Sequence, residues 1–228
     1  MLTVTEALKK RISIREFRPE PLAESLVREI LDVARWSPSG GNLQPWKVIA
    51  VAGAEREAII DLARRTHAAV GADGADESAG RPVYPPNLWE PYRTRRFKQG
   101  EDMYALLGIP RSDRPGRLAR FARNYVMFGA PVELFFIIDN RMGHAQWAHL
   151  GMFMQSIALA ALERGVSSCM QEAWASLRSS LKSHFALDEN ELVYCGMALG
   201  YADETAAVNS LRSERAPVEE FASFRGFA

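Results

Sequence analysis

Polar residues alternate with isoleucines near the N-terminus, in the segment RISIREF. Arg11, Ser13 and Arg15 stand at every second position, and in an extended chain such residues project to one face. Two guanidinium groups beside a hydroxyl suit a phosphate or the polar edge of a planar ring, because each guanidinium can pair with two acceptors. Ile12 and Ile14 would then hold the segment against the core. A charged edge strand on the surface explains the same spacing equally well.

The loop SPSGGNLQPW, residues 37–46, is a second candidate. Its proline and glycines break the preceding helical pattern, and glycine lets backbone amides approach a ligand closely. Asn42 and Gln44 offer donors and acceptors to the carbonyl and imide edges of a ring. By itself, the loop is better explained as an ordinary connection between a helix and a strand.

A third candidate lies near the C-terminus, in NSLRSERAP. Arg212 and Arg215 are three residues apart and could converge on one anion. Such a pair is more commonly solvated at the surface, so alone it too is a weak indication.

Several catalytic patterns are absent from the sequence. It contains no GxGxxG, GxxxxGK[ST], GxSxG or HExxH motif, which argues against the common nucleotide-binding, hydrolase and zinc-protease sites. Cys169 and Cys195 form no CxxC pair and lie in apolar stretches, so they are expected to be buried free thiols. His144 and His149 are five residues apart, which is poor spacing for two ligands on one helix. No metal site is therefore predicted.

The overall composition limits the partners. Lys plus Arg and Asp plus Glu both number 28, and the formal net charge of zero argues against nucleic acid or an anionic membrane as partner. No stretch reaches the roughly 18 apolar residues of a membrane span, and no signal peptide is evident. A cytoplasmic protein is the expectation. The 228 residues suit one domain whose core needs neither disulfides nor metal.

Helices and strands intermix along the chain without a regular βαβ rhythm. Helical patterns are expected at residues 3–10, 22–36, 55–70, 102–107, 114–127, 144–163 and 175–185, and strands at 46–51, 132–138, 166–169 and 192–201. This order favours an α+β fold with one sheet and helices packed around it. Residues 71–123 form an excursion, and a long excursion in a compact domain is often a functional lid.

Together, the three candidate segments resemble the nitroreductase family of FMN proteins. The resemblance rests on R-x-S-x-R-x-F, then S-P-S-G-x-N-x-Q-P-W, then G-x-A-L-G-Y-x-D followed by N-x-x-R-x-x-R-x-P. It covers about Val4 to Val51 and about His144 to Phe227, whereas residues 71–120 match only loosely. It implies a single FMN-binding domain over residues 1–228, with a central mixed, mainly antiparallel sheet surrounded by helices. It also implies an intertwined homodimer with FMN at the subunit interface.

The resemblance assigns cofactor contacts residue by residue. Arg11, Ile12, Ser13 and Arg15 would hold the phosphate, ribityl and pyrimidine side of FMN, with Arg15 near N1 and O2. Arg212 and Arg215 would complete the phosphate clamp, and Pro38, Ser39, Gly40 and Asn42 would reach the partner subunit's flavin. Gln171, Glu172 and Ala173 would lie over the central ring, where a backbone N–H near N5 stabilises the reduced flavin. The side chain of Glu172 is expected to be a solvated acid.

The implied chemistry belongs to the cofactor. NADH or NADPH would pass a hydride to flavin N5 and leave, and a nitroaromatic or quinone-like acceptor would then be reduced, giving ping-pong kinetics. Catalysis by the flavin explains why no catalytic triad or metal set is visible.

The substrate side is expected in the excursion. Trp89, Tyr92 and Arg93 could bind an aromatic, acidic substrate by stacking and charge, and Asn124 and Tyr125 are weaker candidates. Ordinary packing is the alternative for each of them. The apolar helix at residues 144–163 and the tail Phe221–Phe227 are expected to meet the partner subunit.

Rival functions remain open from the sequence. Relatives of the same fold reduce flavins, quinones or enones, dehalogenate, or cleave flavin, and the loosely matched excursion does not separate these activities. A non-catalytic phosphate- or nucleotide-binding module would use Arg11, Arg15, Arg212 and Arg215 in the same way. A nucleic-acid binder would depend on the short basic run Arg93–Lys98, against a net charge of zero.

Overall fold

The computed structural model describes residues 2–70 and 83–227. The α-helices are α1 (Val4–Lys10), α2 (Glu24–Ala34), α3 (Gly53–Val70), α4 (Tyr92–Leu106), α5 (Arg114–Ala122), α6 (His144–Glu163) and α7 (Arg178–His184). The strands are β1 (Lys47–Ala52), β2 (Val132–Asp139), β3 (Ser167–Gln171) and β4 (Glu191–Gly200). Short 3-10 helices lie at η1 (Gly40–Asn42), η2 (Arg123–Gly129), η3 (Glu172–Leu177), η4 (Ala207–Ser210) and η5 (Val218–Glu220).

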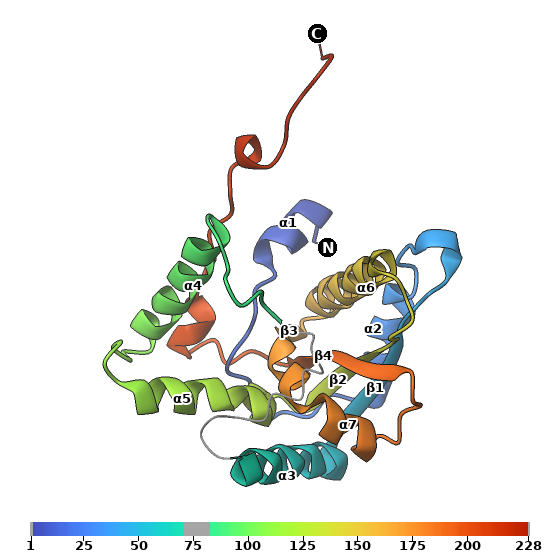
Figure 1. Cartoon of the computed structure of the whole chain (residues 1–228), viewed down its shortest axis with the longest axis vertical. Helices are drawn as coiled ribbons and strands as arrows, with labels where there is room; N and C mark the ends of the chain where they lie inside the picture. The colour runs from blue at the N-terminus through green and yellow to red at the C-terminus, as the bar shows by residue number, and fades with distance from the viewer. Residues whose placement is uncertain (1, 71–82, 228) are drawn as a thin grey trace.

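One sheet forms the centre of the molecule, in the order β1-β2-β4-β3 (Figure 1). All three strand pairs are antiparallel. The N-terminal segment adds a parallel bridge between Ser13 and Ser168 and an antiparallel bridge between Phe17 and Ala202. The predicted α+β fold with a mixed, mainly antiparallel sheet is confirmed.

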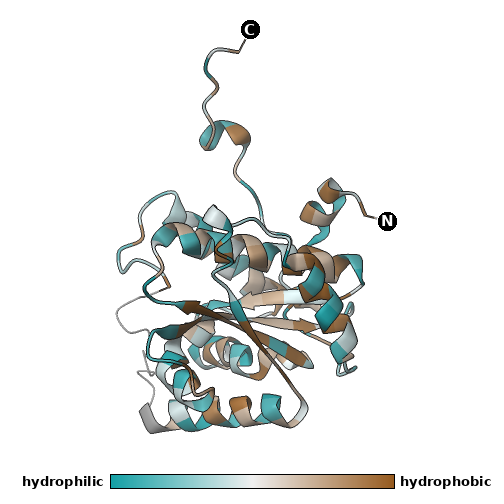
Figure 2. Cartoon of the chain, turned by 90° about the vertical axis from the view of Figure 1, so that its right-hand side faces the viewer, coloured by the Kyte–Doolittle hydropathy of each residue, from teal (hydrophilic) through white to brown (hydrophobic). Residues whose placement is uncertain are grey.

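The core lies on both faces of this sheet because side chains alternate along each strand. On β2, Phe135 and Ile137 pack toward α3 and α7, whereas Leu134 and Phe136 pack toward α2 and α6. In Figures 1 and 2 the strands accordingly run between two layers of helices. A strand buried on both faces is apolar almost throughout, as VELFFII is.

Helix α6 has the bounds predicted from the sequence. It packs against α2, and Gly165, with φ +72°, ends it in the left-handed conformation that favours glycine. Phe153 buries its ring against Trp46, with centroids 4.6 Å apart and planes within 6°. Met152 remains exposed, so apolar surface extends onto the outer side of this helix.

The first helix begins with a side-chain cap. Glu6 N–H donates to the Thr3 hydroxyl at 3.2 Å, and the Thr3 N–H donates to the Glu6 carboxylate at 2.7 Å. This reciprocal capping box fixes where α1 begins. Val4 and Leu8 on the same helix are exposed.

The excursion is more helical than predicted. The helix expected at residues 102–107 begins at Tyr92 and continues to Leu106, a correction to the sequence prediction. None of its residues is buried, so it has no apolar stripe from which a helix could be recognised. Helix α5 ends at Ala122 rather than at Met127, where the backbone turns left-handed with φ 56°. The part of the excursion at residues 71–82 lies outside the described residues.

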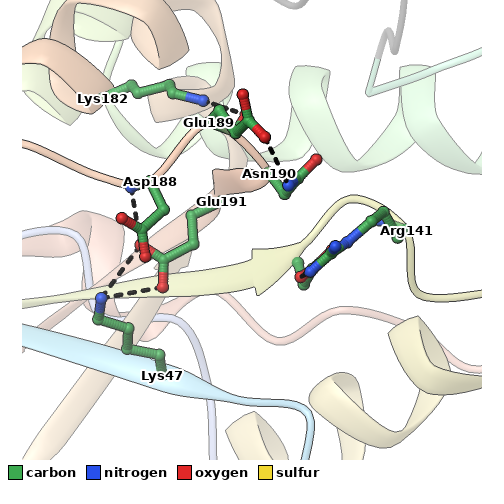
Figure 3. Close-up of polar contacts among 8 residues, drawn as sticks. Lys47, Arg141, Lys182, Asp188, Glu189, Asn190 and Glu191 are labelled. Carbon is green, nitrogen blue, oxygen red and sulfur yellow. Dashed lines mark hydrogen bonds and ion pairs between the residues drawn. The ribbon is translucent and has the colours of Figure 1, made fainter.

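Polar contacts hold the far end of the sheet together (Figure 3). Lys47 on β1 forms an ion pair of 2.9 Å with Glu191 on β4. The Lys182 ammonium donates to the backbone carbonyl of Glu189. Arg141 lowers the pKa of Asp139 to about 2 through side-chain and backbone hydrogen bonds. The contacts of Lys47 and Lys182 tie the turn before β4 to β1 and to α7.

Within the described residues, no helix is long and apolar enough to cross a membrane, and no cluster of His, Cys, Asp and Glu is arranged to hold a metal ion. Cys169 and Cys195 are both free and buried, as the sequence predicted.

Candidate cofactor-binding site

The alternating N-terminal segment lies along the edge strand β3. Ile14 N–H donates to the carbonyl of Ser168 at 3.0 Å, and the Ile14 side chain is buried in the core. Arg11, Ser13 and Arg15 are half-buried. The structure therefore places the isoleucines inward and leaves the polar row accessible, as the alternation predicted.

The C-terminal segment is fastened to this row through Asn209, which is 7% exposed. The Asn209 side chain accepts a hydrogen bond from the backbone N–H of Arg15 at 2.8 Å. Its amide group donates to the carbonyls of Glu16 at 2.7 Å and Asp203 at 2.8 Å. The buried side chain of Asn209 thus fixes the position of the chain just before Arg212 and Arg215.

These arginines lie near the N-terminal row without acidic partners. Arg212 donates to the carbonyl of Asn209 at 3.1 Å, and Arg215 donates to the carbonyls of Ser213 and Glu214 at 2.9 Å. Within the described part of the chain, Arg11, Arg15, Arg212 and Arg215 take part in none of the salt bridges. Burial lowers the pKa of Arg11, and the positive charge of Arg215 lowers it further. Like charges held together without a counter-ion favour an anion between them.

The four arginines Arg11, Arg15, Arg212 and Arg215 are called the clamp below. A cavity of about 350 Å³ opens beside it. Arg11, Arg212 and Lys10 line one part of it, together with Ser168 and Asn209. Ala158 and Leu162 of α6 also line it. The cavity therefore combines cationic and apolar walls, as a site for an anionic organic molecule requires.

Strand β3 leads from this clamp to the residues expected over the flavin ring. Gln171 is 1% exposed, and its Nε2 donates to the Asn124 carbonyl at 2.8 Å. Glu172 and Ala173 open η3, and the first N–H groups of a helix have no partner within it. The Glu172 side chain reaches solvent, but the surrounding protein raises the pKa of its carboxyl by desolvation.

The loop of residues 38–44 lies away from the arginine clamp of its own chain. Gly40 N–H donates to His149 Nδ1 on α6 at 3.3 Å, and a Cβ at Gly40 would come within 3.1 Å of that ring. Gly41 and Asn42 have left-handed φ angles of 60° and 55°. In Figure 1 the loop lies at the right-hand edge, beyond α2 and α6, whereas the N-terminal segment runs near the centre. Pro38 and Asn42 are exposed.

The aromatic substrate candidates occupy the start of α4. Trp89 and Tyr92 are exposed and form an edge-on ring pair with centroids 5.6 Å apart. Arg93 donates to the Glu90 carboxylate at 2.7 Å. Helix α4 packs on η4, and Lys98 pairs with Glu214 at 3.1 Å. Helix α4 therefore contacts the C-terminal segment that carries Arg212 and Arg215, both of which remain exposed.

The two weaker candidates take different places. Asn124 contacts Gln171 and so lies next to β3. Tyr125 is buried among aromatic rings, including that of Trp174, and its hydroxyl is 2.8 Å from Ser176 Oγ. Tyr125 is accordingly a packing residue within one chain.

Sequence reasoning missed an arginine that joins the excursion to the polar row. Arg120 on α5 donates to the carbonyl of Arg15 at 2.8 Å, and its side chain is 9% exposed. Arg123 and Arg120 both pair with Glu16. The local sequence RLARFAR shows several arginines, but nothing in its spacing indicates which one turns inward.

A helix-wrapped antiparallel sheet with a cavity beside its β3 edge, lined in part by Lys10, Arg11 and Arg212, defines an α+β protein with a candidate site for an anionic ligand. The model of the family described as "Nitroreductase family" matches residues 8–201. Because this match spans most of the chain, the protein belongs to the nitroreductase family.

Named relatives cover nearly the whole chain. The 4-nitrobenzoate reductase of Pseudomonas putida is 38% identical over 217 residues, 95% of this chain and 93% of that protein. The chloronitrobenzene nitroreductase of Comamonas testosteroni is 35% identical, over 97% of this chain and 96% of that protein.

Solved structures agree with this assignment. The FMN and NADPH-dependent nitroreductase NfnB from sphigopyxis sp. strain HMH superposes with a TM-score of 0.95 at 39% identity, covering 99% of this chain and all of that one. The FMN-dependent nitroreductase NfnB from Mycobacterium smegmatis, in complex with NADPH, has a TM-score of 0.88 at 27% identity, with 97% of each chain covered.

Proposed function

We propose that this protein is an FMN-dependent oxidoreductase that reduces nitroaromatic compounds with NAD(P)H in a ping-pong cycle. One observation carries the proposal: a family member holds Arg11 and Arg212 in the lining of one cavity, with Arg215 close enough to Arg11 to lower its pKa. The curated relatives named for 4-nitrobenzoate and chloronitrobenzene support a nitroaromatic acceptor. The two NfnB structures support NADPH as the donor.

The residues present fit FMN. Its phosphate needs cations that are not already paired with carboxylates; Glu204 also lines the cavity, but Arg11, Arg212 and Arg215 take part in none of the salt bridges among the described residues. Its ring needs a donor near N5, and the opening amides of η3 are available. When bound, FMN supplies the hydride chemistry at N5.

Each group of residues then has a separate task. Arg11, Ser13, Arg212 and Arg215 bind the phosphate end, and Asn209 fixes the spacing between the two arginine segments. Arg15 would place a positive charge at the pyrimidine edge and would there favour negative charge on the reduced ring. The backbone of Glu172 and Ala173 donates toward N5. No side-chain acid is required, because solvent supplies protons to the acceptor.

A homodimer completes the site in this proposal. Pro38, Ser39, Gly40 and Asn42 lie away from the clamp of their own chain and serve the partner's cofactor. Phe221, Phe224 and Phe227 are 71%, 67% and 80% exposed, on a tail that leaves the body of the molecule (Figure 2). Exposed aromatic rings on an extended tail favour burial against a second copy. The apolar outer side of α6 would be covered in the same way.

The excursion at about residues 71–123 forms the lid of a single 228-residue domain in this proposal. Trp89, Tyr92 and Arg93 would contact an aromatic substrate, with Asn124 nearer the ring. A cytoplasmic location is part of this proposal, and the use of NAD(P)H as donor is consistent with it.

The visible spectrum of the purified protein tests the proposal. A yellow protein whose flavin bands bleach on anaerobic addition of NADPH, and recover when 4-nitrobenzoate is added, is the expected result. Parallel addition of NADH identifies the preferred donor. A colourless protein that takes up no added FMN would overturn the proposal in favour of a phosphate-binding module.

A further inference from the structure

A glycine on the central strand β4 opens a notch in the sheet. A Cβ built on Gly196 would lie 2.1 Å from Glu133 Oε1 and 2.5 Å from Trp174 Cδ1. Both side chains therefore occupy the space that any other residue at position 196 would fill. Glu133 and Trp174 are each 0% exposed, so the notch is sealed from solvent.

A third buried polar side chain starts on the same face. Gln171 pairs with Gly196 across β3 and β4, and paired residues of antiparallel strands have Cβ positions about 5 Å apart on one face. Among the described residues, Gln171 Oε1, Trp174 Nε1 and both carboxyl oxygens of Glu133 have no hydrogen-bond partner. Buried polar atoms are nearly always hydrogen-bonded, so four such atoms around one notch call for an explanation.

The donors and acceptors match in only one protonation state. An ionised Glu133 presents acceptors alone, and Gln171 Oε1 is also an acceptor, which leaves the Trp174 N–H as the single donor. A protonated Glu133 accepts from Trp174 through one oxygen and donates to Gln171 through the other. Gln171 Nε2 already donates onward to the Asn124 carbonyl at 2.8 Å. The chain of donors and acceptors is then complete.

The charged groups around the notch do not supply a counter-ion. Arg56 approaches from α3, but its guanidinium donates to the carbonyls of Ala130 at 2.7 Å and Val126 at 3.3 Å. Arg15 and Arg120 are close enough to affect the Cys169 thiol on β3, whereas Arg56 is the charged group that affects Glu133. Burial raises the pKa of the Cys169 thiol to about 11. The pKa of the Cys195 thiol on β4 is raised by burial as well.

Burial also raises the pKa of the Glu133 carboxyl well above its usual range. The indole N–H of Trp174 and the charge of Arg56 oppose this rise, with smaller effects. The indole therefore lies close enough to act on the carboxyl, although the two groups do not meet hydrogen-bond geometry.

Gln171 and Trp174 flank the dipeptide Glu172–Ala173, whose backbone the proposed function places over the flavin. We propose that a protonated Glu133 joins Trp174 to Gln171, directly or through one water, and thereby fixes that dipeptide against the cofactor. Glu133 is in this sense a positioning residue and does not touch the reacting atoms. The inference rests on the proposed function for its catalytic meaning, but the protonation of Glu133 does not.

Infrared spectroscopy of the full-length apoprotein tests the protonation. At pH 8 in D2O the exposed acids are ionised, so a carbonyl stretch typical of a carboxylic acid reports a buried, protonated one. The band is expected in the wild-type protein and in Glu29→Gln, an exposed control on α2, and not in Glu133→Gln. A wild-type spectrum without the band would overturn the inference, whether or not the protein binds FMN.

Single-turnover bleaching of the flavin by NADPH tests the positioning role. Glu133→Gln can still accept and donate at the same places, so its rate is expected to stay within about twofold of the wild type. Glu133→Leu leaves Trp174 and Gln171 without partners, and a displaced dipeptide is expected to slow the step by about tenfold or more. The phosphate-binding arginines are untouched in both variants, so Glu133→Gln should keep the FMN dissociation constant of the wild type, and Glu133→Leu should lose only the contacts made by the dipeptide.

Two results would contradict the positioning role: a Glu133→Leu rate equal to the wild-type rate, or a Glu133→Gln rate as low as that of Glu133→Leu. A wild-type protein that binds no FMN would instead overturn the proposed function and leave the infrared result standing.

Discussion

The side-chain carbonyl of Asn209 accepts a 2.8 Å hydrogen bond from the backbone N–H of Arg15, although 194 residues separate the two in the chain. Through this contact, the position of the C-terminal arginines depends on the position of the N-terminal row. Ligand affinity and fold stability are therefore coupled at this residue.

Replacing Asn209 with alanine is expected to weaken both properties. The change leaves the Arg15 N–H without its acceptor and removes one of two donors from each of the Glu16 and Asp203 carbonyls, which costs about 1–3 kcal/mol of unfolding free energy. Urea denaturation of the apoprotein measures the stability, and FMN titration measures the affinity. Asn190→Ala is the control, because the side-chain amide of Asn190 makes only a long hydrogen bond of 3.4 Å to Glu189 in the turn before β4 (Figure 3). This variant should change neither quantity. Unchanged FMN affinity in Asn209→Ala would contradict the role of Asn209 as a spacer.

Arg215→Ala is expected to distinguish ligands with and without phosphate. Loss of one guanidinium–phosphate contact should weaken FMN binding by about tenfold to a hundredfold. Riboflavin binding should stay nearly constant, because riboflavin has no phosphate. The apoprotein should be no less stable, since removing Arg215 relieves its repulsion with Arg11. Equal losses for FMN and riboflavin would show that Arg215 does not bind the phosphate.

Arg15→Ala is expected to lower the flavin midpoint potential and slow its reduction. Arg15 takes part in none of the salt bridges among the described residues, and Arg120 and Arg123 pair with the neighbouring Glu16. Its charge is thus free to stabilise the reduced ring. A tenfold loss of that stabilisation corresponds to about 30 mV for a two-electron couple. Redox titration measures the shift, and Arg15→Lys should retain most of the potential. Identical potentials in all three proteins would exclude Arg15 from this role.

Glu133→Gln is expected to stabilise the fold as the pH rises. An unfolded glutamate loses its proton near pH 4.3, whereas burial raises the pKa of Glu133 in the folded state. Above pH 4.3 the folded wild type therefore binds one more proton than the unfolded chain, and its stability falls by about 1.4 kcal/mol per pH unit until the folded pKa is reached. Glutamine does not titrate. Urea denaturation at pH 5, 6 and 7 should show a growing advantage for the variant, and parallel curves would mean that Glu133 ionises normally.

Polar substitutions in the tail are expected to weaken self-association. Burial of a phenylalanine against a partner is worth about 1.5–3 kcal/mol, so Phe224→Ser with Phe227→Ser should dissociate the dimer at higher protein concentration. Analytical ultracentrifugation measures this concentration, and Phe224→Leu with Phe227→Leu provides the control of similar apolarity. A wild-type protein that sediments as a monomer would contradict the dimer itself.

Much of the fold could be predicted from the sequence where burial leaves a regular pattern. The bounds of α6 and the course of β2 follow from apolar runs that end at glycine or at polar turns. Helix α4 could not be predicted, because YRTRRFKQGEDMYAL buries none of its side chains. The left-handed Met127 and Phe128 contradict local preference, and only the tertiary core that encloses them accounts for their conformation.

The candidate site shows the same division. The polar row was predictable because alternation in an extended segment fixes which side chains share a face. The contact of Asn209 with Arg15, and the inward turn of Arg120, depend on long-range packing that no local spacing encodes. Glu133 was a missed indication, since a single acid within VELFFII is already exceptional for a buried strand.

The notch at Gly196 also constrains how this chain can change over evolutionary time. A methyl group at position 196 would collide with both the Glu133 carboxyl and the Trp174 ring, so alanine there becomes acceptable only after both side chains have changed or moved. Conversely, a small apolar residue at position 133 would leave a void beside Trp174 unless position 196 gained volume. Substitutions at position 196 are therefore expected to occur together with changes at positions 133 and 174, although 63 residues separate positions 133 and 196 in the printed sequence.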